Sequence, residues 1–165
     1  MHWTTIAYPL ILALGYAVVY LFLYFFFPHF FSQRAAKFSK QQLFSIPLLI
    51  FLSLLMWQVS VAMANQELGN RLLHAVGGGV LASLACFLAV KDSRVKITKP
   101  QFFILTVLIV TALGVANELA EFFLQQTTGE IFASTITDTW LDLLSNTLGT
   151  LVATLVALPF VKKPK

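Results

Sequence analysis

Charged residues are scarce in this chain of 165 residues: 11 lysines and arginines and 7 acids make up 11% of it, whereas 58% is hydrophobic. The mean hydropathy is +0.82. A soluble globular domain carries about 25% charged residues, so this composition indicates a protein whose main solvent is not water. The single cysteine, Cys86, excludes an intramolecular disulfide bond. Nothing in the sequence resembles a nucleic-acid-binding module, and we expect no nucleic-acid partner.

Five apolar stretches are long enough to cross a membrane, because about 20 apolar residues span the hydrocarbon core as a helix. They cover residues 4–27, 43–63, 72–90, 102–124 and 139–160. We therefore predict an all-α fold: one integral membrane helical bundle over residues 1–165, with about five transmembrane helices and short connections. No basic residue precedes the first stretch and no small-residue cleavage site follows it, so we expect it to be retained as an anchor.

Basic residues divide unevenly between the connections of this predicted bundle. Ten of the eleven would lie on one side, namely Arg34, Lys37, Lys40, Lys91, Arg94, Lys96, Lys99, Lys162, Lys163 and Lys165. Lysine and arginine gather in cytoplasmic loops, which predicts an outer N-terminus and an inner C-terminus. The acids show the reverse distribution, since only Asp92 maps to the inner half.

Seven polar side chains interrupt the apolar stretches at one depth, near the predicted outer interface. They are Arg71, His74, Glu118, Glu121, Asp138, Asp142 and Asn146. Residues three or four apart share one face of a helix, so each of three helices carries a polar stripe. The stripes are Arg71, His74 and Gly78; Thr111, Gly114, Glu118, Glu121 and Gln125; and Asp138, Asp142, Asn146 and Gly149. Three stripes at one depth predict one shared, outward-facing cavity.

The charges of this cluster do not balance. One arginine against four carboxylates leaves a net charge of −3 with His74 neutral, and like charges about 4 Å apart repel by roughly 4 kcal/mol at an effective dielectric near 20. Such a cluster must hold water, share protons, bind a cation or face a positively charged ligand group. In the structural alternative, Arg71 clamps one or two carboxylates and the others reach interfacial water.

The sequence alone assigns neither a catalytic residue nor a cofactor. One histidine with several oxygen donors would suit Mg²⁺, Mn²⁺ or Ca²⁺ better than a structural zinc ion, but no metal site is assigned. Ser145 or Thr147 could act as a nucleophile and His74 as a general acid or base, yet no spacing singles out any of them. The run Gly77 to Gly79 could be a hinge, but small residues at Ala75, Gly79 and Ser83 favour close helix packing.

Three segments carry a resemblance to a known family. NRLLHAVGGGVLA, ANELAEFF and DTWLDLLSNTLGTLVA are similar to the VanZ-like membrane proteins, over a core of residues 70–156. Asp142, Asn146 and Gly149 give the best match, while His74 and Glu118 or Glu121 match weaker positions. The second glutamate and Asp138 also resemble the related YjdF-type family, and the glutamine and arginine usual between the glutamate and aspartate helices of VanZ-like proteins are lacking. The resemblance implies a multi-pass protein of the bacterial inner membrane, and the type member of the family contributes to resistance against lipoglycopeptides such as teicoplanin.

Three functions are compatible with these features. The first is an outward-facing site that binds or modifies the headgroup of an envelope lipid or of a lipid-linked cell-wall intermediate, with membrane lipids as partners. The second is a structural or partner-binding membrane subunit. The third is a proton-coupled transporter, for which acids near the membrane midplane and inverted repeats are expected. Neither feature is visible in the sequence.

Overall fold

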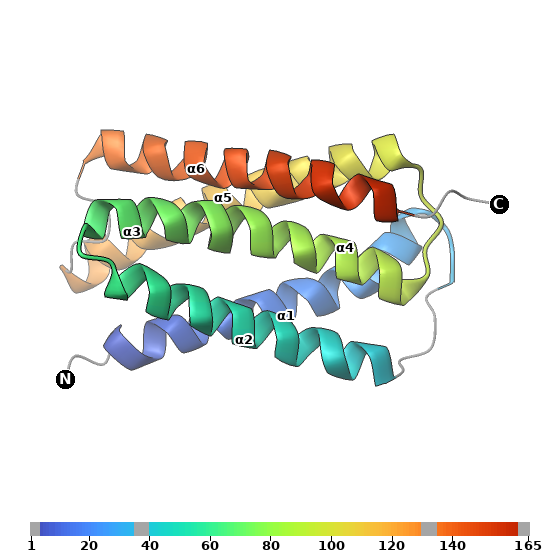
Figure 1. Cartoon of the computed structure of the whole chain (residues 1–165), viewed down its shortest axis with the longest axis horizontal. Coiled ribbons are helices and arrows are strands. Elements are labelled where there is room, and N and C mark those ends of the chain that lie inside the picture. The colour runs from blue at the N-terminus through green and yellow to red at the C-terminus, as the bar shows by residue number, and fades with distance from the viewer. Residues whose placement is uncertain (1–3, 35–39, 130–134, 162–165) are drawn as a thin grey trace.

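Five helical spans lie side by side in one bundle (Figure 1). The structure, a computed structural model, describes residues 4–34, 40–129 and 135–161, and these ranges contain no strand. The helices are α1 (Thr4–Phe30), α2 (Lys40–Ala62), α3 (Gln66–Leu72), η1 (Leu73–Leu81), α4 (Ala82–Ser93), α5 (Lys99–Thr128), α6 (Ile136–Ala157) and η2 (Leu158–Phe160). Since α3, η1 and α4 follow one another without a break, they form the third span. The predicted all-α membrane bundle with five spans is confirmed.

Polar caps extend the spans beyond their apolar stretches. The Asn65 side chain accepts a hydrogen bond from the backbone nitrogen of Leu68 at the start of α3. Thr98 and Gln101 form a capping box at the start of α5, and Gly129 ends that helix in the left-handed conformation. Thr135 caps α6 through the backbone nitrogen of Asp138. These caps satisfy backbone groups that a helix end leaves without partners, so α5 runs several residues past both predicted ends.

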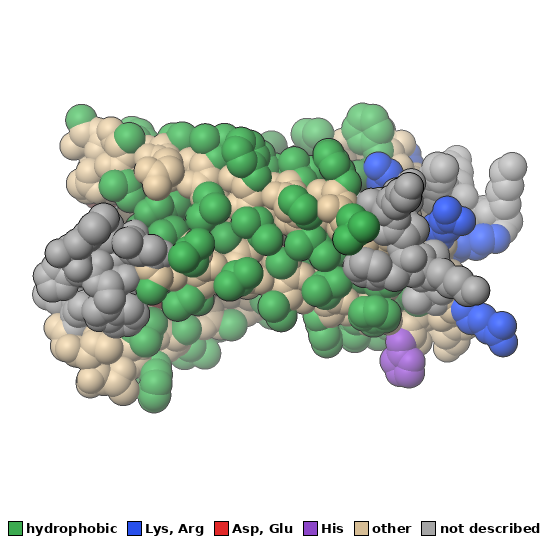
Figure 2. Space-filling model, turned by 90° about the horizontal axis from the view of Figure 1, so that it is seen from below, with side chains coloured by type: hydrophobic (Ala, Val, Ile, Leu, Met, Phe, Trp, Pro, Cys, Tyr) green, Lys and Arg blue, Asp and Glu red, His purple; other side chains and the backbone are tan. Residues whose placement is uncertain are grey.

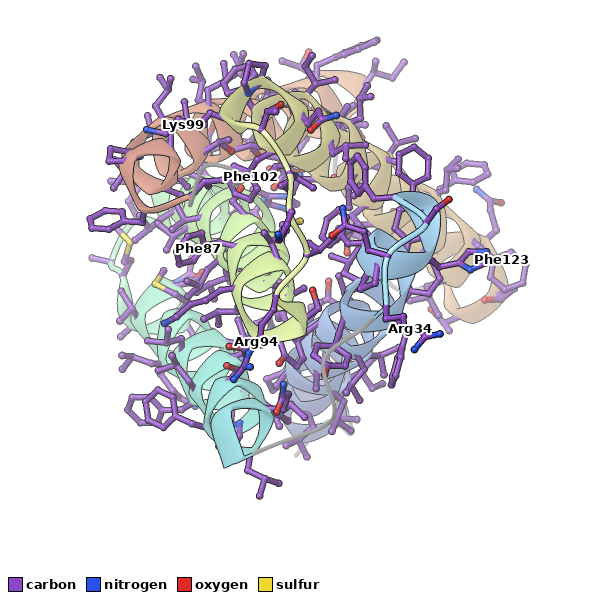
Figure 3. The ribbon with its side chains drawn as sticks, turned by 90° about the vertical axis from the view of Figure 1, so that its right-hand side faces the viewer. Arg34, Phe87, Arg94, Lys99, Phe102 and Phe123 are labelled. Carbon is purple, nitrogen blue, oxygen red and sulfur yellow. The ribbon has the colours of Figure 1, made fainter. Side chains whose placement is uncertain are left out.

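The helices pack mainly as two groups joined by the third span. α1 lies against α2 and α4, while α6 lies along η1 and α5. The apolar core, which includes Tyr20, Leu23, Phe27 and Leu49, occupies the half of the bundle that contains α4. At its edge the rings of Phe87 and Phe102 meet edge to face, with centroids 6.2 Å apart (Figure 3). Large hydrophobic side chains cover the outer surface seen in Figure 2, as contact with lipid requires.

Small residues bring the third span and α6 into backbone contact. A Cβ atom on Gly79 would lie 2.6 Å from the backbone oxygen of Asn146 and 2.8 Å from the Cα of Gly149. A Cβ atom on Gly149 would overlap the backbone oxygen of Ala75. The packing role predicted for Gly79 is therefore confirmed, and Gly149 has the same role on the opposite helix. The same segment also has a feature that the sequence did not indicate: η1 is a π-helix, a rare form that is frequently found at functional sites.

The two ends of the bundle differ in charge. Exposed Arg34, Lys91, Arg94 and Lys96 gather at the end where α1 finishes and α5 begins, which we call the basic end (Figures 2 and 3). Lys37, Lys162, Lys163 and Lys165 lie outside the described residues. Asp92 is buried at the basic end, where the hydroxyls of Tyr20 and Ser45 donate hydrogen bonds to it. We call the opposite end, where α3 and α6 begin, the site end. That the site end faces outward stays a prediction.

Candidate functional site

Arg71 ties the third span to α6 at the site end. Its guanidinium group forms ion pairs with the carboxylates of Asp138 and Asp142. Its Nη1 atom also donates to the backbone oxygen of Asp138 over 3.1 Å. Asn70, one residue earlier on α3, donates from Nδ2 to Asp142 Oδ1 over 3.2 Å. Two of the four predicted carboxylates are therefore held by one clamp, as the structural alternative expected of Arg71.

His74 lies one turn deeper, between two carboxylates from two helices. Its Nε2 atom is 3.4 Å from Asp142 Oδ1 on α6, and its Nδ1 atom is 3.9 Å from Glu118 Oε1 on α5. The Nδ1 atom is also 3.5 Å from Asn146 Nδ2. His74, Glu118 and Asp142 are all buried, with 8%, 8% and 2% of their surface exposed. The polar stripes of three helices thus meet at His74.

Glu118 is the least satisfied member of this group. Thr139 lies close enough to influence its carboxylate, yet neither oxygen has a hydrogen-bond partner of normal geometry, although both are fully buried. The Oδ1 atom of Asn146 is likewise buried without a partner. Most buried polar atoms in folded proteins are hydrogen-bonded. The oxygens of these two side chains are therefore unusual, because they are acceptors that lack a well-placed donor at the centre of the site.

Glu121 belongs to a different part of the site. It accepts hydrogen bonds from the Tyr8 hydroxyl of α1 over 3.2 Å and from Asn117 Nδ2 over 2.8 Å. Its carboxylate therefore faces α1, whereas that of Glu118 faces His74. The seven predicted residues are all at the site end, but they form two neighbouring groups: the Arg71 clamp with His74, Glu118 and Asn146, and Glu121 with its own partners.

A cavity of about 360 Å³ opens between these groups. One wall is polar and consists of Tyr8, His74, Asn117, Glu121 and Asn146. The remaining lining is mostly apolar and includes Ile11, Leu12, Val19, Met56, Leu73 and Leu113. From Tyr8 to Val19 the lining follows α1 for about 16 Å, roughly half the thickness of the hydrocarbon core. The cavity is therefore amphipathic along its length.

Comparison with known families decides the classification of the chain. The family described as "Predicted membrane protein (DUF2238)" matches residues 3–163, nearly the whole sequence. The chain belongs to the DUF2238 family. Comparison with curated proteins and with solved structures gives no match. The family assignment agrees with a multi-pass membrane protein, and the finer resemblance to VanZ-like and YjdF-type proteins stays a prediction.

One predicted stripe of this DUF2238 protein is partly wrong. Thr111 is exposed, and the buried positions before Gly114 are Val110, one turn earlier, and Thr106, two turns earlier. Both the third and the fourth residue before Gly114 could continue the stripe, and packing of α5 against α6 selects the fourth. Gln125, at the other end of the stripe, is only partly buried. Of the five residues of the predicted stripe, only Gly114, Glu118 and Glu121 are therefore buried.

Two contributions to the site of the DUF2238 protein were not predicted. Tyr8 and the apolar lining from α1 stand far from the polar stripes in the sequence, and nothing in a uniformly apolar helix marks the face that lines a cavity. Asn70 precedes Arg71 directly and could have been identified as a capping or clamping residue.

Ser145 and Thr147, considered as nucleophiles, donate their hydroxyl hydrogen bonds to backbone oxygens of their own helix, those of Leu141 and Leu143. Neither lines the cavity.

Proposed function

We propose that this protein binds an envelope lipid, or a lipid-linked cell-wall intermediate, in the amphipathic cavity at the site end. The observation that carries this proposal is one cavity with a polar wall near the end of the bundle and an apolar lining that continues towards its middle. A lipid has the same division, because its headgroup needs hydrogen-bond partners and its chains need apolar surface. Ligand pockets in general combine apolar lining with a few convergent polar groups.

The polar wall favours a headgroup that carries hydroxyl or ammonium groups. Tyr8 and Asn117 hold the Glu121 carboxylate in place, where it presents a negative charge to the cavity. A carboxylate accepts hydrogen bonds from hydroxyls and ammonium groups and repels a bare phosphate. His74 and Asn146 complete the wall with groups that can donate or accept.

Access from the surrounding lipid is compatible with the packing of the helices. α1 and α5 line the cavity from two sides, but among the described residues they make little direct contact with each other. The Tyr8–Glu121 hydrogen bond joins these two helices at the site end. A lipid chain could enter between α1 and α5 below that bond, without passing through water.

The cellular setting of the proposal rests on the sequence. The division of basic residues favours an outward-facing site end, and the resemblance to VanZ-like proteins suggests the bacterial inner membrane and a link to lipoglycopeptide resistance. The same site could also modify the headgroup. His74 lines the cavity and Asp142 lies next to its Nε2 atom, an arrangement in which a histidine can transfer protons.

The experiment fills the cavity and measures the lipid that stays bound. Gly15 lines the cavity and a Cβ atom there would meet nothing within 4 Å, so we expect the larger side chain of Gly15→Leu to occupy part of the cavity. The wild type, purified in mild detergent and examined by native mass spectrometry, should retain a lipid that Gly15→Leu loses. Val18→Phe is the matched control, because Val18 lies on the same helix and is 65% exposed. Equal lipid content in the wild type and Gly15→Leu would contradict the proposal.

A further inference from the structure

We propose that His74, Glu118 and Asp142 form a binding site for one divalent cation. The side-chain donor atoms of these three residues lie within 4.8 Å of one another, and they come from three different spans. Ligand distances of about 2.0–2.2 Å leave neighbouring ligands of one ion roughly 3–4 Å apart, so the three side chains need to draw together by only about 1 Å to share an ion. The inference does not depend on lipid binding, because the cation would lie behind the polar wall of the cavity.

An observation independent of the acidic cluster points to the cation. The Glu118 side chain is more than nine-tenths buried, and neither of its oxygens has a hydrogen-bond partner of normal geometry. Burial of a carboxylate without a partner is unfavourable, more so where lipid surrounds the protein. A cation between Glu118, His74 and Asp142 would supply the missing interaction at the position where the structure leaves it unfilled.

The net charge of these buried side chains agrees with the binding of a divalent cation. Arg71 pairs with Asp138 and Asp142, and Glu118 lies on the other side of His74, so one positive charge against three carboxylates leaves a net charge of −2 with His74 neutral. Glu121 is not counted, because it lies in the other group with Tyr8 and Asn117. One divalent cation would make the buried group neutral, whereas a monovalent cation or a single proton would leave one negative charge.

The donor set selects a class of cation. Mg²⁺ and Ca²⁺ prefer oxygen ligands alone, whereas an imidazole nitrogen with carboxylates suits Mn²⁺ or Zn²⁺. Three protein ligands leave further positions for water, as in catalytic rather than structural metal sites. Arg71 and Asn70 hold Asp142 in place from behind, which is the role that hydrogen-bonding neighbours play around metal ligands.

The test measures Mn²⁺ binding to the purified full-length protein in detergent after treatment with a chelator. Electron paramagnetic resonance and calorimetry should show one Mn²⁺ per chain, displaced by Zn²⁺. Glu118→Gln should lower the affinity at least about 10-fold, since loss of a neighbour of a metal ligand alone costs about that much. Glu118 makes no hydrogen bond of normal geometry, and glutamine keeps an oxygen that Thr139 can approach, so the variant should fold. Glu67→Gln, which removes an exposed carboxylate at the same end, should bind like the wild type.

Two results would overturn the inference. One is the absence of Mn²⁺ and Zn²⁺ binding by the folded wild type at millimolar concentration, which would indicate that Glu118 holds a proton instead. The other is unchanged binding by both Glu118→Gln and His74→Gln, which would place the ion elsewhere. Gly15→Leu should keep its Mn²⁺ affinity, so failure of the lipid proposal and failure of the cation site are distinguishable.

Discussion

Arg71 at the end of α3 forms an ion pair with Asp142 in α6, and it pairs with Asp138 one turn earlier on the same helix. The side chains of Arg71 and Asp142 are 17% and 3% exposed. A single guanidinium group thus pairs with two carboxylates at the point where the third span and the last span meet. Removal of that group leaves two negative charges close together and largely shielded from water.

Arg71→Gln should therefore destabilise the protein strongly. Breaking a buried ion pair by removing one partner costs roughly 3–5 kcal/mol, and here two carboxylates lose their partner. Thermal unfolding in detergent, followed by tryptophan fluorescence, should show a markedly lower midpoint. Arg94→Gln at the basic end is the control, because Arg94 is exposed and its replacement should have little effect. Equal midpoints for the wild type and Arg71→Gln would mean that the clamp adds no stability.

Asp142→Asn should behave differently from Arg71→Gln. Asparagine keeps the shape and an oxygen acceptor, and Arg71 keeps its ion pair with Asp138. The variant should reach the membrane at near-normal level with a thermal midpoint close to that of the wild type, yet lose the lipid retention that we propose for the wild type. Loss of function only because the protein disappears from the membrane would favour the structural or partner-binding subunit. A fully active Asp142→Asn variant would show that the Asp142 carboxylate is not needed for function.

The sequence predicts the fold well because membrane spans follow from hydrophobic length, which is a local property. It also places the polar residues at one end of the bundle, since depth follows from position along a span. It does not predict which carboxylate pairs with Arg71, because Glu118, Asp138 and Asp142 lie at similar depth and only the rotation of each helix distinguishes them. Tyr8 is missed for the same reason: its partner Glu121 is 113 residues away, and α1 is apolar all round.

Gly149→Ala should disrupt the contact between the third span and α6. The added methyl group would overlap the backbone oxygen of Ala75, and a backbone atom cannot move aside as a flexible side chain can. Overpacking typically costs about 1–3 kcal/mol, and separation of the two helices would also displace Asn146 from His74. Thermal unfolding should show the loss. Gly15→Ala is the matched control, because its methyl group would meet nothing within 4 Å and should leave stability unchanged.

The orientation of the bundle decides whether the cavity faces the envelope or the cytoplasm, and cysteine labelling can measure it. Cys86 is buried and can be replaced by alanine to provide a background without accessible thiols. Gln126, near the end of α5 at the site end, and Lys96, at the basic end, are both exposed. If lysine and arginine mark the inner side, Gln126→Cys should react with a membrane-impermeant maleimide in intact cells, and Lys96→Cys should react only after the membrane is opened. The reverse pattern would leave the cavity and the cation site intact as structural proposals. It would, however, exclude a ligand in the outer leaflet and with it the link to lipoglycopeptide resistance.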